Sequence, residues 1–325
     1  MKLCPPIAIL LFSLAATAQQ EQPPAIKVDV DVVNLLCSVR DKKGALIANL
    51  TKDDFEVFED GKRQQIRYFA RETDLPLTIG LLVDVSVSQE GLIEVERRAA
   101  SQFFSQVLGK KDVAFLISFG AEAELLQDFT NSQRLLRAAL DQLRLSASAG
   151  GIHPGPVPTM SKPRGTILFD AVYLAASEKL RGEVGRKVII LLTDGVDQGS
   201  RVKLQEAMES AQKADAIIYS VYYSDPGFYR GRGGGFGIGF GMGDGDLRRM
   251  SEETGGREMK VDRRRPLEDI FKEIQTEMRS QYAIGYTPAN PAKDGSFRRI
   301  EIRPRGKDLK VQARKGYYAL KPGTT

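Results

Sequence analysis

The residues best suited to chemistry lie in one stretch, Leu81-Leu82-Val83-Asp84-Val85-Ser86-Val87-Ser88. An apolar run ends there in a carboxylate, and two hydroxyl groups follow at alternate positions. On a turn that leaves a buried strand, Asp84, Ser86 and Ser88 can direct three oxygens into one small volume. Hard divalent cations such as Mg2+ prefer all-oxygen surroundings, so this turn is a candidate metal site. In the alternative interpretation Asp84 caps a helix and the serines bond to turn backbone, because the string D-x-S-x-S alone is common in polar loops.

The candidate site depends on the strand before it, and the apolar pattern predicts that strand. Residues 77–83 are almost continuously apolar, which is typical of a strand covered on both faces. Further strands are expected at 113–119, 123–129, 188–192, 216–222 and 257–261, and helices at 89–108, 132–145, 167–180, 201–214, 246–254 and 266–279. This alternation predicts an α/β fold with a doubly wound, mostly parallel sheet. Ligands bind such sheets outside the carboxyl ends of the strands, and Asp84 and Asp194 both lie at strand ends.

Two details of the helices can be read from spacing and residue type. The first helix has apolar residues at a spacing of about 3.6, which predicts its buried face: Leu92, Val95, Ala99, Phe103 and Val107. The helix 132–145 is preceded by Asn131, a residue type favoured as a helix cap. We therefore expect Asn131 to cap that helix.

The segments on either side of the α/β region, 26–72 and 280–319, show a period of two instead. Val28, Val30 and Val32 alternate with acidic residues in the first segment, and a similar alternation begins at Tyr282 in the second. Each segment is too small to bury a core comfortably by itself. We therefore expect the two to pair into one flanking β-sandwich, with residues 76–279 as an α/β domain inserted within it.

Residues 1–18 have the pattern of a signal peptide. A weakly positive start is followed by an apolar core at 7–16 and by Ala16-Thr17-Ala18, which is typical of a cleavage site. We therefore expect an exported protein, periplasmic or secreted. No stretch reaches the roughly 18 apolar residues that a membrane-spanning helix needs. Cys37 is then the only cysteine of the mature chain, and we expect it to be a small buried strand residue.

The composition argues against several other kinds of site. The net charge of +5 over 325 residues is too mild to indicate a concentrated nucleic-acid-binding face. The glycine-rich stretch 230–245 contains neither a dinucleotide-binding motif nor a P-loop, so we expect a surface loop near the metal face. His153 is the only histidine, and its loop context disfavours a Ser/His/Asp hydrolase and a histidine-rich metal site.

The residues of the candidate site resemble those of a known family. Asp84, Ser86 and Ser88, with Thr166 at the start of a helix and Asp194 at the end of a strand, resemble the metal-ion-dependent adhesion site (MIDAS) of von Willebrand factor type A (VWFA) domains. The resemblance covers about residues 76–279 and keeps the five positions in order. One departure is Val87, where many members carry glycine. The flanking motifs Leu50-Thr51-Lys52-Asp53-Asp54-Phe55 and Gly316-Tyr317-Tyr318 resemble an exported acidobacterial subgroup of this family.

The resemblance implies that these five residues surround one Mg2+ or Mn2+. Because only Asp84 and Asp194 bring full charges, the cation would stay electrophilic and accept an Asp or Glu carboxylate from a partner protein. Asp170 and Asp197 are candidates for hydrogen bonds around the ligands. The implied function is a non-enzymatic, metal-dependent adhesion or protein-interaction module. The alternative is a metal-dependent hydrolase with Asp84 as nucleophile or ligand, although no general base is evident near the site in the sequence.

Overall fold

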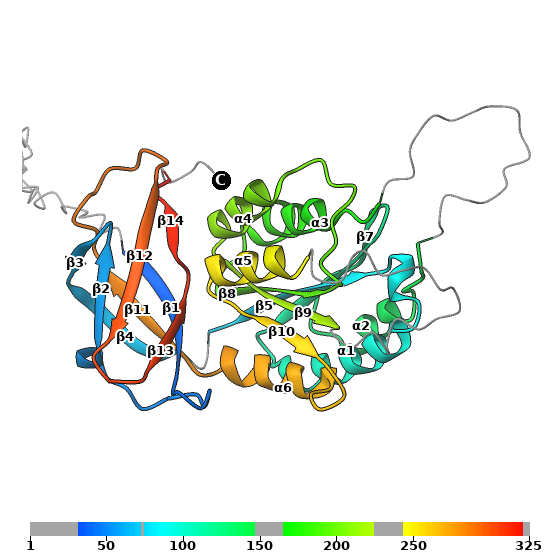
Figure 1. Ribbon diagram of the computed structural model, residues 1–325, viewed down its shortest axis with the longest axis horizontal. Helices are drawn as coiled ribbons and strands as arrows, with labels where there is room; N and C mark the ends of the chain where they lie inside the picture. Colours follow the sequence, from blue (N-terminus) through cyan, green and yellow to red (C-terminus); the bar gives the residue numbers. More distant parts are fainter. Residues whose placement is uncertain (1–31, 73–74, 147–164, 224–242, 321–325) are drawn as a thin grey trace, which may run out of the picture. The chain divides into compact units, whose positions relative to one another are not determined.

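The computed structural model describes residues 32–72, 75–146, 165–223 and 243–320 (Figure 1). Several features named in the sequence lie outside these ranges: the predicted signal peptide, Val28, Val30, His153 and most of the glycine-rich stretch 230–245. Within them, no helix is both long and apolar enough to cross a membrane.

A six-stranded sheet forms the centre of the α/β region, in the order β10-β9-β8-β5-β6-β7. The strands are β5 (Leu77–Asp84), β6 (Val113–Phe119), β7 (Ala123–Thr130), β8 (Arg186–Leu192), β9 (Ala216–Tyr223) and β10 (Glu258–Val261). All neighbouring pairs run parallel except β6 with β7, which is antiparallel. The mostly parallel, doubly wound α/β class predicted from the sequence is therefore confirmed.

Strand β5 lies in the middle of this sheet because its residues suit a place covered on both faces. All eight of its residues are buried, as the apolar run predicted. Gly80 has a specific packing reason: a Cβ atom there would overlap the ring of Phe115 on the neighbouring strand. The ring of Phe115 therefore packs directly on the backbone of β5, the strand that ends in Asp84.

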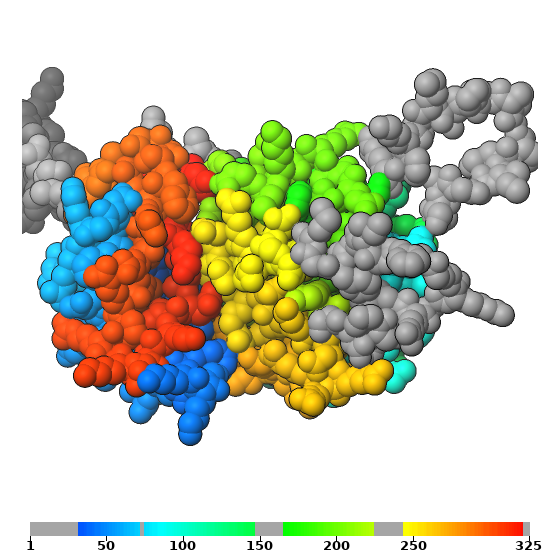
Figure 2. All heavy atoms as spheres, in the orientation of Figure 1, coloured from blue at the N-terminus to red at the C-terminus, as the bar shows by residue number. Residues whose placement is uncertain are grey.

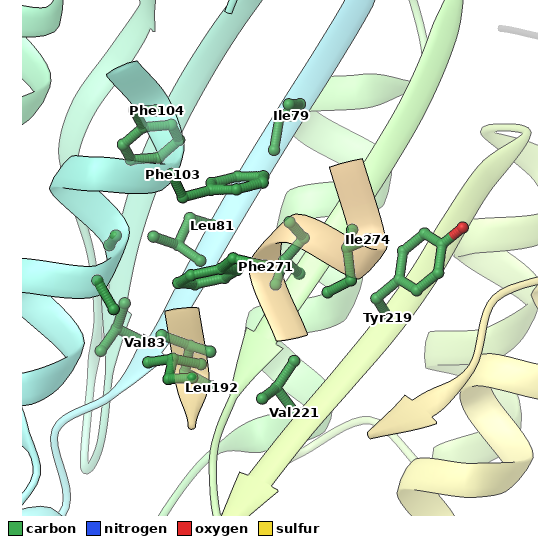
Figure 3. Packing of buried hydrophobic residues seen from close by; sticks show 14 of the residues in the cluster. Ile79, Leu81, Val83, Phe103, Phe104, Leu192, Tyr219, Val221, Phe271 and Ile274 are labelled. Atoms are coloured by element: carbon green, nitrogen blue, oxygen red, sulfur yellow. The ribbon is translucent and has the colours of Figure 1, made fainter. Parts of the chain in front are cut away.

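Helices cover both faces of the sheet and bury separate apolar clusters. One face packs against α1 (Ile93–Val107), α2 (Gln133–Leu140) and α6 (Leu267–Met278). The other packs against α3 (Leu168–Leu174) with its π-helical continuation (Ala175–Leu180), α4 (Leu204–Lys213) and α5 (Asp244–Thr254). Phe103 of α1 and Phe271 of α6 stack with ring centroids 4.6 Å apart, which joins these two helices over the sheet (Figure 3).

Two sequence predictions about the helices are wrong in detail. Helix α2 is shorter than predicted, and its cap is Ser132, whose hydroxyl accepts a hydrogen bond from Leu135 N at 3.4 Å. Asn131 is not the cap. On α1, Val95 is only half-buried, and Glu96 takes the core position instead.

The flanking segments form two four-stranded sheets. One has the order β13-β1-β11-β4 and the other β14-β12-β2-β3. Their strands are β1 (Val33–Arg40), β2 (Phe55–Glu59), β3 (Lys62–Gln64), β4 (Ile66–Glu72), β11 (Gln281–Tyr286), β12 (Phe297–Pro304), β13 (Lys310–Ala313) and β14 (Gly316–Tyr318). N-terminal β1 pairs with C-terminal β11 and β13, and β2 pairs with β12. A shared core that includes Cys37, Val57 and Ile284 joins the two sheets into the predicted sandwich.

The α/β region joins the sandwich between β4 and β11, which are neighbours in one sheet. Arg186, almost fully buried at the start of β8, donates hydrogen bonds to the carbonyls of Leu75 and Met278, one on each connection. On the face shown in Figure 2 the C-terminal strands abut the segment after α5, where Gln312 Nε2 donates to the carbonyl of Gly256 at 2.6 Å. Arg186 thus links the segment that enters the α/β region to the end of the helix that leaves it.

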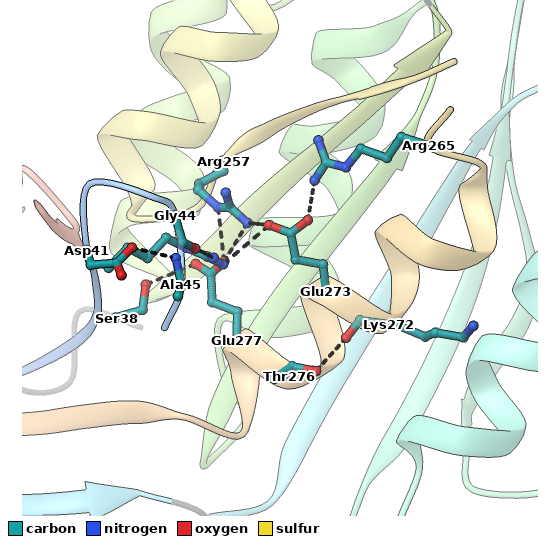
Figure 4. Close-up of polar contacts among 11 residues, drawn as sticks. Ser38, Asp41, Gly44, Ala45, Arg257, Arg265, Lys272, Glu273, Thr276 and Glu277 are labelled. Carbon is teal, nitrogen blue, oxygen red and sulfur yellow. Dashed lines mark hydrogen bonds and ion pairs between the residues drawn. The ribbon is translucent and has the colours of Figure 1, made fainter. Parts of the chain in front are cut away.

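A charged cluster adds to this contact (Figure 4). Glu277 of α6 is fully buried and accepts hydrogen bonds from Ser38 Oγ at 3.0 Å, Arg40 at 2.6 Å and Arg257 Nε at 3.0 Å. Ser38 and Arg40 belong to β1, so the cluster links the sandwich to α6. Glu273 extends it through Arg257 and Arg265.

We predict that Glu277→Ala destabilises the protein by about 3 kcal/mol, because it removes the buried counter-charge of Arg40 and Arg257 and leaves them only the partly exposed Glu273. Asp269→Ala is a matched control on the same helix, since Asp269 and Lys272 form an exposed ion pair at 3.3 Å. That pair should contribute at most about 1 kcal/mol. Urea unfolding of both variants measures the two values, and equal small losses would contradict the prediction.

Candidate metal centre

Asp84 is held rigidly at the carboxyl end of β5. Its side chain is fully buried, and both oxygens accept hydrogen bonds: Oδ1 from Ser86 N at 2.8 Å and Oδ2 from Thr193 Oγ1 at 2.7 Å. Thr193 follows the last residue of β8, and its hydroxyl in turn accepts from Gly195 N at 3.1 Å. The carboxylate is therefore fixed by the loops of two neighbouring strands.

The two serines of the motif lie between Asp84 and Asp194. Ser86 Oγ and Ser88 Oγ are 2.9 Å apart, and Ser88 Oγ donates to Asp194 Oδ2 at 2.6 Å. Asp194 comes from the loop after β8, which is 106 residues further along the chain than Ser88. The structure therefore brings four of the five predicted ligands together: Asp84, Ser86, Ser88 and Asp194.

Thr166 reaches the same end of the sheet through its backbone. Its carbonyl accepts hydrogen bonds from Gln198 N at 3.0 Å and Gly199 N at 3.1 Å, in the loop that contains Asp194. The next residue, Ile167, donates its N–H to the carbonyl of Gly120 just after β6. In the described part of the chain, the Thr166 hydroxyl makes no hydrogen bond to the other four residues, so its place as a ligand stays a prediction.

Asp170 and Asp197 bind the loop after β8 to the start of α3. Asp170 Oδ1 accepts from the backbone N–H groups of Arg201 and Val202, both at 2.9 Å. Asp197 Oδ1 accepts from Phe169 N at 3.2 Å and from Ser200 Oγ at 2.5 Å. These bonds shape the loop that carries Asp194, and a direct role around the metal stays a prediction.

The electrostatics of the site favour a cation. Burial, together with the negative charge of Asp194, raises the pKa of Asp84 to about 6, although its hydrogen bonds oppose this shift. Within the described residues, neither aspartate forms an ion pair with a lysine or arginine. Two carboxylates and two hydroxyls with no basic neighbour form an oxygen donor set that fits Mg2+ or Mn2+. No group of three His, Cys, Asp or Glu side chains that could hold a metal ion occurs in the described ranges, and the donor set at this site includes two hydroxyls.

Three residues near the site were missed from the sequence. Thr193 could have been recognised as the residue that immediately precedes Asp194 on an apolar strand. Glu96 is fully buried on α1, and burial together with the charge of Asp84 raises its pKa well above the usual value. Gln89 is also fully buried, just after the serines. The signal for Glu96 was its place four residues after Leu92, in the apolar row of the helix.

Comparisons with known proteins give only distant likenesses. No family model matches this sequence, and no curated protein matches it. A BatB protein from Bacteroides thetaiotaomicron is 19% identical over 62% of this chain and 97% of its own, with a TM-score of 0.47. A von Willebrand factor type A protein from Catenulispora acidiphila is 11% identical over 92% and 76%, with a TM-score of 0.49. Proximal thread matrix protein 1 from the mussel byssus, with a zinc-occupied MIDAS motif, is 14% identical over 68% and 49%, with a TM-score of 0.48. The function must therefore be argued from the site.

The raised pKa of Asp84 predicts how stability depends on pH in the metal-free protein. Between the usual value of 3.8 and about 6, the folded state keeps a proton that the unfolded state has released, so stability falls as pH rises. Asp84→Asn cannot lose this proton, and its stability relative to wild type should rise by up to about 3 kcal/mol across that window.

Urea unfolding at pH 4, 5, 6 and 7 in the presence of a chelator measures this difference. Asp141→Asn is a suitable control because Asp141 is exposed at the end of α2. A stability difference between Asp84→Asn and wild type that stays constant with pH would contradict the assigned environment of Asp84.

Proposed function

We propose that this chain is an exported VWFA-type adhesion or protein-interaction module that binds a carboxylate of a partner protein through Mg2+ or Mn2+. Asp84, Ser86, Ser88, Thr166 and Asp194 would hold the cation. The observation that carries the proposal is the chain of contacts from Asp194 through Ser88 to Ser86, beside a buried Asp84, with neither acid paired to a basic residue of the described chain. By its flanking motifs, the chain would belong to the acidobacterial exported subgroup.

The charge of the site supports a carboxylate ligand. Two carboxylates balance a divalent cation, and neutral hydroxyls complete the protein's share of the coordination. Mg2+ favours six ligands and usually keeps exchangeable waters. A partner's Asp or Glu can replace one of these waters. Asp194 is half-buried and Ser88 is exposed, so an approaching side chain can reach this side of the site.

The same contacts argue against the hydrolase alternative. A nucleophilic carboxylate must be reached by an organic substrate, but the Asp84 side chain is fully buried and so is open at most to a small ion. A serine nucleophile needs an adjacent base. In the described part of the chain, the side-chain partners of Ser86 and Ser88 are each other and the carboxylates of Asp84 and Asp194, and no histidine or lysine is among them.

Metal binding should stabilise the folded protein. At a Mg2+ concentration of about 100 times its dissociation constant, binding to the folded state alone adds about 2.7 kcal/mol. Asp84→Ala, Ser86→Ala and Asp194→Ala should each abolish this gain in a thermal or urea unfolding assay. Asp128→Ala should keep it, because Asp128 is an exposed residue of β7 that pairs with Lys179 of the π-helical segment and not with the site. A gain that persists in all three site variants would mean that the metal binds elsewhere.

Partner binding should require the metal and the site together. Immobilised wild-type protein should capture a protein from exported fractions in Mg2+ and release it with EDTA, and the Asp194→Ala protein should not capture it. Acetate should compete for the bound partner, whereas neutral acetamide at the same concentration should not. Capture that survives EDTA or the Asp194→Ala substitution would contradict a metal bridge. Turnover of phosphate or carboxylate esters with Mg2+ that is lost in Asp84→Ala would contradict the non-enzymatic assignment.

A further inference from the structure

Two polar side chains that follow the metal loop in the chain are buried without a hydrogen-bond partner among the described residues. Gln89 and Glu96 are both fully inaccessible to solvent. Neither the amide of Gln89 nor the carboxyl of Glu96 forms a hydrogen bond within the described residues. Buried polar groups in native proteins are nearly always satisfied, so an exception points to a water, an ion or a functional role.

A series of backbone hydrogen bonds connects Glu96 to Ser86, one of the candidate metal ligands. Gln89 N donates to the carbonyl of Ser86 at 2.9 Å, Leu92 N to that of Gln89 at 2.8 Å, and Glu96 N to that of Leu92 at 2.9 Å. Gln89 ends a 3-10 turn, Leu92 immediately precedes α1, and Glu96 lies in the first turn of that helix; all three are fully buried and form one row along the chain. Helical side chains lean toward the N-terminus, and the carboxyl of Glu96 therefore leans toward the metal loop. The charge of Asp84 acts on it there.

The position of Glu96 is otherwise a core position. Leu92, Ala99, Ala100 and Phe103 of the same buried face belong to the apolar cluster between α1 and the sheet. A leucine or methionine at position 96 would complete this row without leaving a carboxyl group unsatisfied. Packing alone therefore does not account for an acid at this place.

We propose that Glu96 is a positioning residue of the metal centre: it is a neutral acid in the metal-free protein, and when a cation binds it releases its proton to solvent, so that its carboxylate adds a negative charge near Asp84 and strengthens binding without touching the ion. This assignment rests on the proposed metal-binding function. Gln89 lies between Ser86 and Glu96 in the chain, and its buried side-chain amide can hydrogen-bond to polar groups next to the metal loop. Residues that act on a metal through its ligands commonly change metal affinity by about 10- to 100-fold when they are substituted.

The test compares Glu96→Gln, Glu96→Met and wild type by isothermal titration with Mg2+ alone. Glu96→Gln removes the charge at nearly constant shape, and Mg2+ should bind at least about tenfold more weakly. Glu94→Gln is the matched control, because it removes the same charge from an exposed residue of the same helix that pairs with Arg97. The control should bind Mg2+ within about twofold of wild type, since exposed charges are screened.

Glu96→Met separates the positioning role from a structural one. Replacing an unsatisfied buried acid by an apolar side chain of similar size should raise the unfolding midpoint of the metal-free protein, while Mg2+ binding weakens. A lower midpoint with an unchanged dissociation constant would show that Glu96 is structural and would overturn the proposal. Unchanged Mg2+ binding in Glu96→Gln would overturn it as well. If wild type itself binds no Mg2+, the proposed function fails. If wild type binds Mg2+ and both Glu96 variants bind it equally tightly, only the role of Glu96 is rejected.

Discussion

The hydrogen-bond ladder that places β5 between β6 and β8 is the constraint on which the rest of the structure depends. Its register sets Asp84 opposite Phe119 and Val83 opposite Leu192, so the three strands end at the same edge. A slip of one residue would move every side chain of β5 to the other face of the sheet. Because both faces are buried, such a slip would disrupt the packing on each of them. The loops that follow these strands must therefore meet, and residues 106 positions apart in the chain become hydrogen-bonded neighbours.

The acidic residues at the two ends of the central sheet have different hydrogen-bond donors around them. Where α6 meets the sandwich, Glu277 is surrounded by donors that include Arg40 and Arg257, and its charge is balanced. At the opposite end of the sheet, Asp84 and Asp194 have only hydroxyl and backbone donors within the described chain. Uncompensated buried charge is costly, and the raised pKa of Asp84 expresses that cost. A bound cation is the simplest group that would remove it, so the imbalance itself is the strongest physical argument for a metal.

Much of the fold could be predicted from the sequence because burial on both faces leaves continuous apolar runs, as in β5 and β9. The order of the strands could not, since it depends on contacts between distant segments. On α1, spacings through Val95 and through Glu96 both fit a period of 3.6, and a charged residue is normally expected outside. Only packing against the sheet decides that Glu96 is the buried one. Similarly, Asn131 and Ser132 are both good caps, and backbone geometry selects Ser132.

The topology also determines which way the candidate site faces. The α/β region leaves the sandwich at the amino end of β5 and returns through the end of α6, so both connections lie at the edge of the sheet opposite Asp84 and Asp194. Arg186 binds a carbonyl of each connection from the start of β8, the strand whose other end leads to Asp194.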